Sequence, residues 1–205
     1  MSARDQLRPL APAMAGTLLP GFPDPVLDAQ SAFRAVLEAM SRPGRVQRLP
    51  RPPAPPAPVF PAAGAVLLAL VDSATPVLTD AGPEAEAWLR FHAGCPLAGS
   101  PAEADFVLAT GTPPPLAALR AGTDEDPQLS ATLILQVQAL EEGSGWRLTG
   151  PGIEREHRLR VAGAPPGFIA ERTANAALFP RGVDVILCAG DRVAALPRTT
   201  WIEEG

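Results

Sequence analysis

The hydrophobic positions of this chain recur at two spacings, which indicates helices interleaved with short strands. The longest helical pattern follows Asp24-Pro25, an N-cap acid and a proline at the first helical position, and it stops at Pro43-Gly44. Its apolar residues return every three or four positions, and such a stripe typically faces the core. The stripe consists of Val26, Ala29, Phe33, Val36, Leu37 and Met40.

Four further segments predict helices. They are a small apolar helix from Pro61 to Val71, a helix that begins at Pro83 and stops at Gly94, a short helix from Pro115 to Arg120, and a helix from Pro166 to Leu178. Residues 50–61 carry seven prolines and therefore predict a surface loop or an extended strap instead of regular structure.

Short runs of branched and apolar residues predict strands at 76–79, 106–109, 131–137, 145–149, 156–161 and 183–188. The turn Glu141–Gly145 predicts a hairpin between the third and fourth of these runs. A Gly190-Asp191 turn predicts a second hairpin, followed by the polar exit Pro197–Thr200. We expect the strand at 156–161 to lie at an edge, because it alternates polar and apolar residues.

This alternation of helices and strands predicts an α/β protein with a mixed sheet flanked by helices. We expect residues 1–22 to form an N-terminal arm and residues 23–205 to form a single domain.

Composition narrows the class of protein. The formal charge of the 205 residues is −5, which does not favour nucleic-acid binding, and no apolar run is long enough to span a membrane. The N-terminus lacks the clean apolar stretch of a secretory signal. The two cysteines make no disulfide framework, so we expect a cytoplasmic protein with reduced thiols.

All seventeen basic residues are arginines, and the chain contains neither lysine nor tyrosine. A pyridoxal-phosphate enzyme needs a lysine for its internal Schiff base, and a Walker-A phosphate loop needs one for the terminal phosphates. Both chemistries are therefore excluded, and we expect no cofactor. No zinc-site spacing joins the histidines and cysteines, so we expect no metal either.

Four residues beside apolar patterns are candidates for binding an anion or a substrate: Arg34, Arg90, Arg198 and Thr199. Arg198 and Thr199 follow a strand end, where α/β sheets place ligands, although a buried structural ion pair of Arg198 is an equal alternative. Arg34 could instead be satisfied on its own helix, since acceptors lie at i−4 and i+4. A row of arginines at 42, 45, 48 and 51 could bind phosphate groups or face solvent.

His92 is a further candidate, three residues before Cys95. The pair could be a thiol–imidazole dyad, but Cys95 follows a helix C-terminus, where the helix dipole disfavours a thiolate. The simpler interpretation is that His92 caps the helix. Cys188 lies within an apolar strand and is expected to be buried.

Five segments together resemble the phosphonate-metabolism H family, whose members belong to the bacterial carbon–phosphorus lyase core complex. These segments are Asp28–Gly44, Leu89–Leu97, Gly122–Val137, Leu148–Ile153 and Phe179–Thr200, and the likeness covers Phe22 to Thr200 in matching order. The resemblance implies a fold related to the large domain of aminotransferase-type pyridoxal-phosphate enzymes, without the cofactor.

The resemblance also implies a role in phosphonate catabolism. With the G and I proteins of that complex and the accessory ATPase-like L protein, such a chain takes part in forming alpha-D-ribose 1-methylphosphonate 5-triphosphate from ATP and methylphosphonate. The J protein, which carries an iron–sulfur cluster, later cleaves the carbon–phosphorus bond. The implied partners are the G, I and J proteins of the carbon–phosphorus lyase and a second copy of the chain.

Two roles follow for such a protein: it either grips the polyanionic substrate or serves as a structural subunit that is inactive alone. The scarcity of acid–base residues favours the second role. An alternative outside the family is a free-standing phosphotransfer or hydrolase enzyme acting on a phosphonate or nucleotide.

Overall fold

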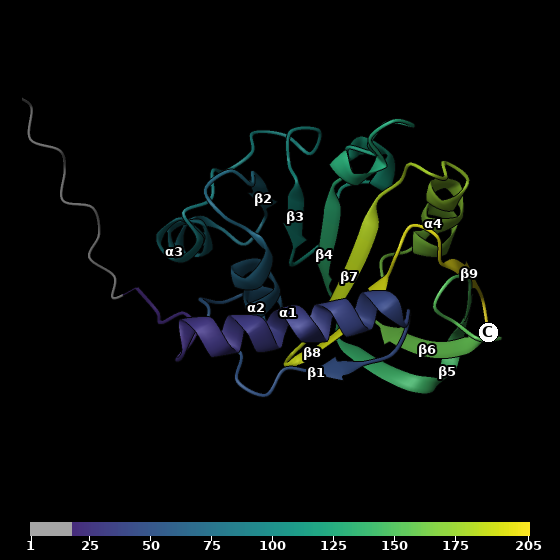
Figure 1. Cartoon of the computed structure of the whole chain (residues 1–205), viewed down its shortest axis with the longest axis horizontal. Helices are drawn as coiled ribbons and strands as arrows, with labels where there is room; N and C mark the ends of the chain where they lie inside the picture. The colour runs from purple at the N-terminus through teal and green to yellow at the C-terminus, as the bar shows by residue number, and fades with distance from the viewer. Residues whose placement is uncertain (1–17) are drawn as a thin grey trace, which may run out of the picture.

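The computed structural model describes residues 18–205, which form two sheets and four α-helices (Figure 1). The larger sheet has the order β1-β8-β7-β4-β3-β2. Its strands are β1 (Gln47–Arg48), β2 (Val77–Thr79), β3 (Phe106–Ala109), β4 (Thr132–Gln136), β7 (Asp184–Ala189) and β8 (Arg192–Leu196). Neighbours from β2 to β7 pair in parallel, whereas β8 pairs antiparallel with both β7 and β1. The predicted α/β class with a mixed sheet is confirmed.

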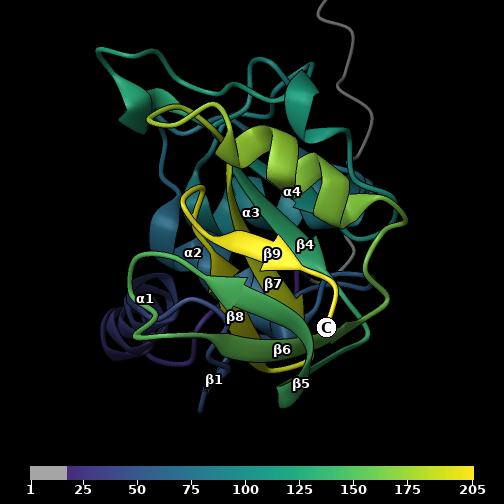
Figure 2. The same cartoon turned by 90° about the vertical axis from the view of Figure 1, so that its right-hand side faces the viewer.

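The smaller sheet, in the order β6-β5-β9, is antiparallel throughout. It consists of β5 (Ala139–Thr149), β6 (His157–Ala162) and β9 (Trp201–Glu203). Together with α4 (Phe168–Ala176), it lies in front of the larger sheet in Figure 2. Leu133 and Leu187 of the larger sheet pack in one cluster with Leu148, Leu159 and Phe168. The predicted edge strand at 156–161 is confirmed by β6.

Three helices share the other core cluster: α1 (Pro25–Ser41), α2 (Pro61–Leu70) and α3 (Pro83–Ala93). Ile134 and Ile186 point to this side, whereas their neighbours Leu133 and Leu187 point to the other, as the two-residue period of a strand requires. Because both faces are covered, the parallel strands read as continuous apolar runs.

The predicted inward face of α1 is wrong for most of its stripe, of which Val36 alone is buried. The helix begins as expected, since the Asp24 carboxylate accepts from the backbone N–H groups of Val26 and Leu27. Its inward side, however, carries small or short residues together with a buried aspartate, and large apolar residues face outward. The buried residues are Asp28, Ala32, Val36 and Ala39, whereas Val26, Leu27, Phe33 and Leu37 are exposed. Small side chains allow α1 to pack closely on α2 and β8.

The predicted hairpin between 131–137 and 145–149 is also wrong. Strand β4 enters the larger sheet between β3 and β7, whereas β5 pairs with β6 and β9. The Glu141–Gly145 segment is no turn, because it continues β5 through a register shift between Glu142 and Trp146. The final hairpin of β7 and β8, in contrast, is confirmed.

Three smaller elements differ from the sequence prediction. The helix expected at 115–120 is a single 3-10 turn, η1 (Leu116–Ala118). A second 3-10 turn, η2 (Pro127–Leu129), and strand β9 were not predicted. Of the arm expected at 1–22, the part before residue 18 lies outside the described residues.

The proline-rich segment 50–61 was expected to be either a surface loop or an extended strap. It is a strap that crosses the carboxyl end of β4. The side chain of Gln136 accepts from the backbone N–H of Phe60 at 2.5 Å and donates to the carbonyl of Pro58 at 3.0 Å. The Asp28 carboxylate pairs with Arg51 at 2.8 Å, which ties the strap to α1. Among residues 18–205, no helix is both long and apolar enough to cross a membrane.

Candidate functional site

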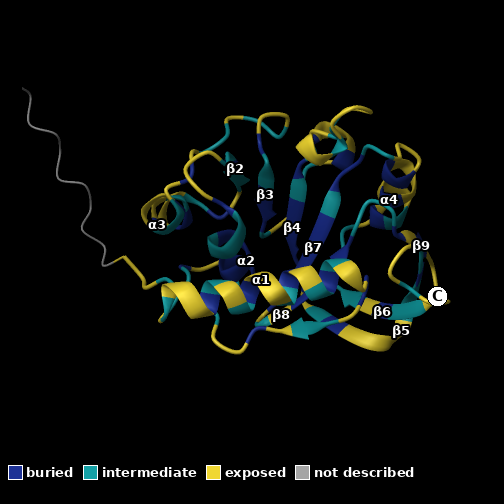
Figure 3. Ribbon diagram, viewed as in Figure 1, coloured by how far each residue is buried: buried dark blue, intermediate teal, exposed yellow. Residues whose placement is uncertain are grey.

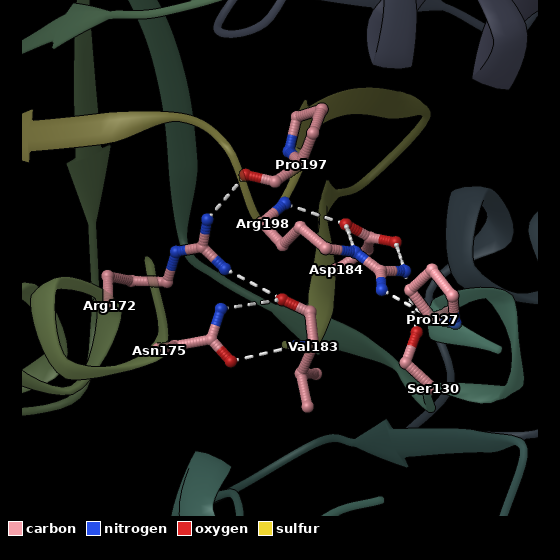
Figure 4. A network of polar contacts seen from close by, with 8 residues as sticks. All are labelled: Pro127, Ser130, Arg172, Asn175, Val183, Asp184, Pro197 and Arg198. Carbon is pink, nitrogen blue, oxygen red and sulfur yellow. Dashed lines mark hydrogen bonds and ion pairs between the residues drawn. The ribbon is translucent and has the colours of Figure 1, made fainter. Parts of the chain in front are cut away.

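The side chain of Arg198 lies in a polar network, and its donors are used within the chain (Figure 4). The Asp184 carboxylate accepts from Nε of Arg198 at 3.2 Å and from Nη2 of Arg198 at 2.6 Å. Nη1 donates to the carbonyl of Pro127 and Nη2 to the hydroxyl of Ser130, both at 2.6 Å. The side chains of Arg198 and Asp184 are each 16% exposed. Of the two interpretations of Arg198, the structure shows the half-buried ion pair.

A second arginine extends this network from α4. Arg172 is 1% exposed, and it donates to the carbonyl oxygens of Val183 at 2.9 Å and Pro197 at 2.6 Å. Asn175 binds the backbone N–H and the carbonyl of Val183 with its amide. Burial lowers the pKa of Arg172 to about 10. The positive charge of Arg198 also lowers this pKa, whereas the negative charge of Asp184 raises it. Arg172 is therefore still charged at neutral pH. We call Arg172, Asn175, Asp184 and Arg198 the arginine network.

The direction of β8 explains why Arg198 lies away from the usual ligand edge of such a sheet. Asp184 begins β7 and lies beside Thr132, the first residue of β4. Because β8 is antiparallel, its carboxyl end meets the amino ends of the parallel strands. Ligands of α/β sheets bind at the opposite edge, outside the carboxyl ends. Thr199 follows Arg198 at this amino-end edge.

Arg34 and Arg90 lie on α1 and α3, and both are exposed. Within residues 18–205, neither forms an ion pair, and neither shares a polar partner with Arg198. The expected partner of Arg34 on its own helix, Glu38, pairs instead with Arg42 at 3.1 Å. The structure therefore does not bring the three arginines together, and their binding of an anion stays a prediction.

His92 holds the chain segment that precedes α1. Its Nε2 lies 3.0 Å from the carbonyl oxygen of Leu19, and the indole Nε1 of Trp88 donates to the same oxygen at 3.0 Å. The ring packs so closely against Gly21 that a Cβ there would lie 2.8 Å from Nδ1. The contact of His92 is thus with this segment, whereas the end of α3 is formed by the N–H of Gly94 bonding to the carbonyl of Arg90.

Neither cysteine is an activated thiol. Cys95 and Cys188 are free and buried, and burial raises the pKa of each thiol. Within the described part of the chain, no three His, Cys, Asp or Glu side chains are placed to hold a metal ion.

The arginine row between α1 and the strap does not form a phosphate cradle, because three of its members pair with different carboxylates. The pairs are Arg42–Glu38, Arg48–Asp191 at 2.6 Å and Arg51–Asp28.

The comparisons with known proteins agree with the segments that suggested a family. The sequence profile of the bacterial phosphonate metabolism protein PhnH matches residues 20–203. The chain belongs to the PhnH family. A PhnH relative from Rhizobium meliloti (strain 1021), named alpha-D-ribose 1-methylphosphonate 5-triphosphate synthase subunit PhnH, is 40% identical over 187 residues, which are 89% of this chain and 94% of the relative. The putative C-P lyase subunit protein HtxG of Stutzerimonas stutzeri is 42% identical over 173 residues, 84% of this chain and 85% of that one.

The PhnH match gives the structural features a family context. Of the segments that carried the resemblance, Asp28–Gly44 contains most of α1, and Phe179–Thr200 contains Asp184 and Arg198 of the arginine network. Arg172 and Asn175 lie outside those segments and were missed. Their signal in the sequence was a helix whose inward positions include two polar residues.

Proposed function

We propose that this chain is the PhnH component of a carbon–phosphorus lyase core complex and takes part in forming alpha-D-ribose 1-methylphosphonate 5-triphosphate. The observation that carries this proposal is the similarity to two proteins named as subunits, over 89% and 84% of the chain. Its partners would be the G, I and J proteins of that complex, and ATP and methylphosphonate would be substrates of the whole assembly.

The role that the geometry supports best is a structural one. Arg198 directs its donors to groups within the chain, both cysteines are buried, and Arg34 and Arg90 lie on separate helices. A polyanion would be held more effectively by several guanidinium groups that converge on one place. The chemistry is then carried out in the complex, with this chain shaping or supporting it.

The test compares the isolated chain with the reconstituted complex. We expect ATP and methylphosphonate to react only when the partner proteins are present, and the Arg90→Ala complex to retain wild-type kcat and KM. Loss of product from an intact Arg90→Ala complex would support substrate binding by this chain instead. Turnover by the pure isolated chain would favour the free-standing enzyme.

Three finer properties are part of the same proposal. We expect a homodimer when the chain is alone, which sedimentation equilibrium tests. We expect a cytoplasmic location, which cell fractionation tests. A descent of the mixed sheet from the large domain of aminotransferase-type enzymes is supported by the resemblance, and superposition of β2 to β8 on such enzymes tests it. The lack of lysine supports function without pyridoxal phosphate.

A further inference from the structure

One side of α1 is exposed along the length of the helix (Figure 3), and it carries large apolar residues. Val26 is 76% exposed, Phe33 is 48% exposed and Leu37 is 56% exposed. Together with the half-buried Met40, they follow one another at intervals of seven, four and three residues, so they lie on one side of the helix. We call Val26, Phe33, Leu37 and Arg34 the outward face of α1.

This arrangement is typical of a helix that packs against another protein. Single exposed apolar residues are common, but a line of them along one side of a helix is the pattern that fills a groove. The inward side of α1 already packs on α2 and β8, so the outward line is not needed for the core of this chain.

Arg34 adds a charge to this face. It lies next to Phe33 and three residues before Leu37, and it has no ion pair among residues 18–205. Glu38, which is close enough in sequence to pair with it, is engaged by Arg42. A surface that complements this face is therefore apolar, with a carboxylate opposite Arg34.

A second copy of the chain fits this requirement poorly. A two-fold pairing of α1 with itself would bring two copies of Arg34 to the interface. The carboxylates of α1 would not neutralise them, because Asp28 is buried against Arg51 and Glu38 is paired with Arg42. The charge pattern thus favours a different protein.

We propose that the outward face of α1 docks another protein of the complex, by placing Phe33 and Leu37 in an apolar groove and Arg34 against a carboxylate. This inference rests on the proposed function, since it takes the partner from among the G, I and J proteins. It adds the place on this chain where the contact is made and the chemistry of the partner surface.

The experiment co-expresses the tagged full-length chain with the G, I and J proteins and measures the affinity of the purified chain for the assembly of those three. The test variants are Phe33→Glu, Leu37→Glu and Arg34→Glu. The control is Phe91→Glu, because Phe91 is an aromatic residue of α3 that is 68% exposed. Arg34→Lys keeps the charge without the planar fork. Unchanged urea midpoints show that each variant folds.

We expect each of the three glutamate variants on α1 to bind the partners at least tenfold more weakly than the wild type, because residues at the centre of an interface carry most of its affinity. Phe91→Glu should bind like the wild type, and Arg34→Lys should lie in between. Two results would place the docking site elsewhere while the proposed function stands. In the first, all α1 variants bind the partners as tightly as the wild type does. In the second, Phe91→Glu weakens binding as much as the glutamate variants on α1 do.

Other occupants of this face give different results. Failure of the wild type to bind any of the three proteins would overturn the proposed function and this inference together. A wild-type dimer that Phe33→Glu converts to a monomer would assign the face to a second copy. Loss of hydrogen-exchange protection in residues 1–17 on the Phe33→Glu change would assign it to the chain's own N-terminus. Either of the last two results would contradict docking of another protein of the complex.

Discussion

On α1, large apolar side chains face solvent, whereas on α4 an arginine lies in the interior. The arginine network finds its partners within the chain: Arg172 and Arg198 donate to carbonyl oxygens, a hydroxyl and the carboxylate of Asp184, and of their nitrogens only the buried Nε of Arg172 has no acceptor among residues 18–205. The outward face of α1 has no such complement, because neither its apolar line nor Arg34 is matched within residues 18–205. The difference separates a feature that stabilises this chain from a feature that a partner would complete.

Mutations in these two regions should therefore differ in their effect on the stability of the isolated chain. Removing one member of the network takes hydrogen bonds or an ion pair from buried or half-buried partners, which reduces the stability of the isolated chain. Removing a member of the outward face leaves the isolated chain nearly unchanged, because those side chains contact mostly water.

The largest effect is expected for Asp184→Ala, which leaves the half-buried guanidinium of Arg198 without its carboxylate. The free energy of unfolding should fall by about 3–5 kcal/mol, as measured by urea denaturation. The control is Asp191→Ala, which removes the partner of Arg48, a side chain that is 78% exposed, and should cost about 1 kcal/mol or less. Equal losses in the two variants would contradict a special role for the network.

A smaller loss is expected for Arg172→Met, which keeps a long apolar stem but removes the donors to the carbonyls of Val183 and Pro197. Each carbonyl then loses its charged donor and keeps one other, the amide of Asn175 on Val183 and the N–H of Thr200 on Pro197, so the free energy of unfolding should fall by about 1–3 kcal/mol. Arg160→Met on the exposed side of β6 is the matched control and should change it by about 0.5 kcal/mol or less. A stabilised Arg172→Met variant would show that the desolvation of the charge outweighs its hydrogen bonds.

On α1 itself, two positions on different sides of the helix should respond with effects of different size. Phe33→Ser should change the free energy of unfolding by about 0.5 kcal/mol or less, because Phe33 is on the outward face. Val36→Ala should lower it by about 1–3 kcal/mol, because Val36 is 6% exposed and packs in the core. Thermal unfolding of both variants checks this, and the reverse order would mean that α1 is rotated about its axis.

The smallest effect concerns the exposed pair Arg48–Asp191 between β1 and the last hairpin. The hydrogen bond from Arg48 holds the pKa of Asp191 below its ordinary value of 3.8. The pair therefore contributes stability above that pH, and the contribution is lost as the pH falls through the lowered pKa. In the Arg48→Ala variant, NMR titration of the Asp191 carboxyl should show a pKa closer to 3.8. An unchanged value would mean that Arg48 does not hold Asp191 in solution.

Local signals explain which parts of the fold could be predicted. Pro83 and Gly94 bound α3, and the Gly190-Asp191 turn fixes the last hairpin, because each acts within a few residues. The side of α1 that faces the core could not be read in this way. Apolar spacing identifies a stripe, but the packing partners decide whether it or the stripe of small residues is buried.

The site was predictable only in part, for the same reason. Arg198 stands out in the sequence because it follows a strand, but its meeting with Asp184 depends on β8 running antiparallel to β7. Arg172 reaches this place from a helix, across a distance in sequence that no local pattern spans. The exclusion of pyridoxal phosphate needed no structure, since it follows from the absence of lysine.

The bond between Gln136 and the strap has a consequence for where substrates can be handled. At the carboxyl edge of β4, the place where an α/β sheet would ordinarily receive a small molecule, the amide of Gln136 already binds the backbone of Phe60 and Pro58. Backbone groups of the same chain thus occupy the position of a ligand at the end of β4. A small molecule could reach the end of β4 only by displacing the proline-rich strap, which Arg51 also ties to Asp28 of α1.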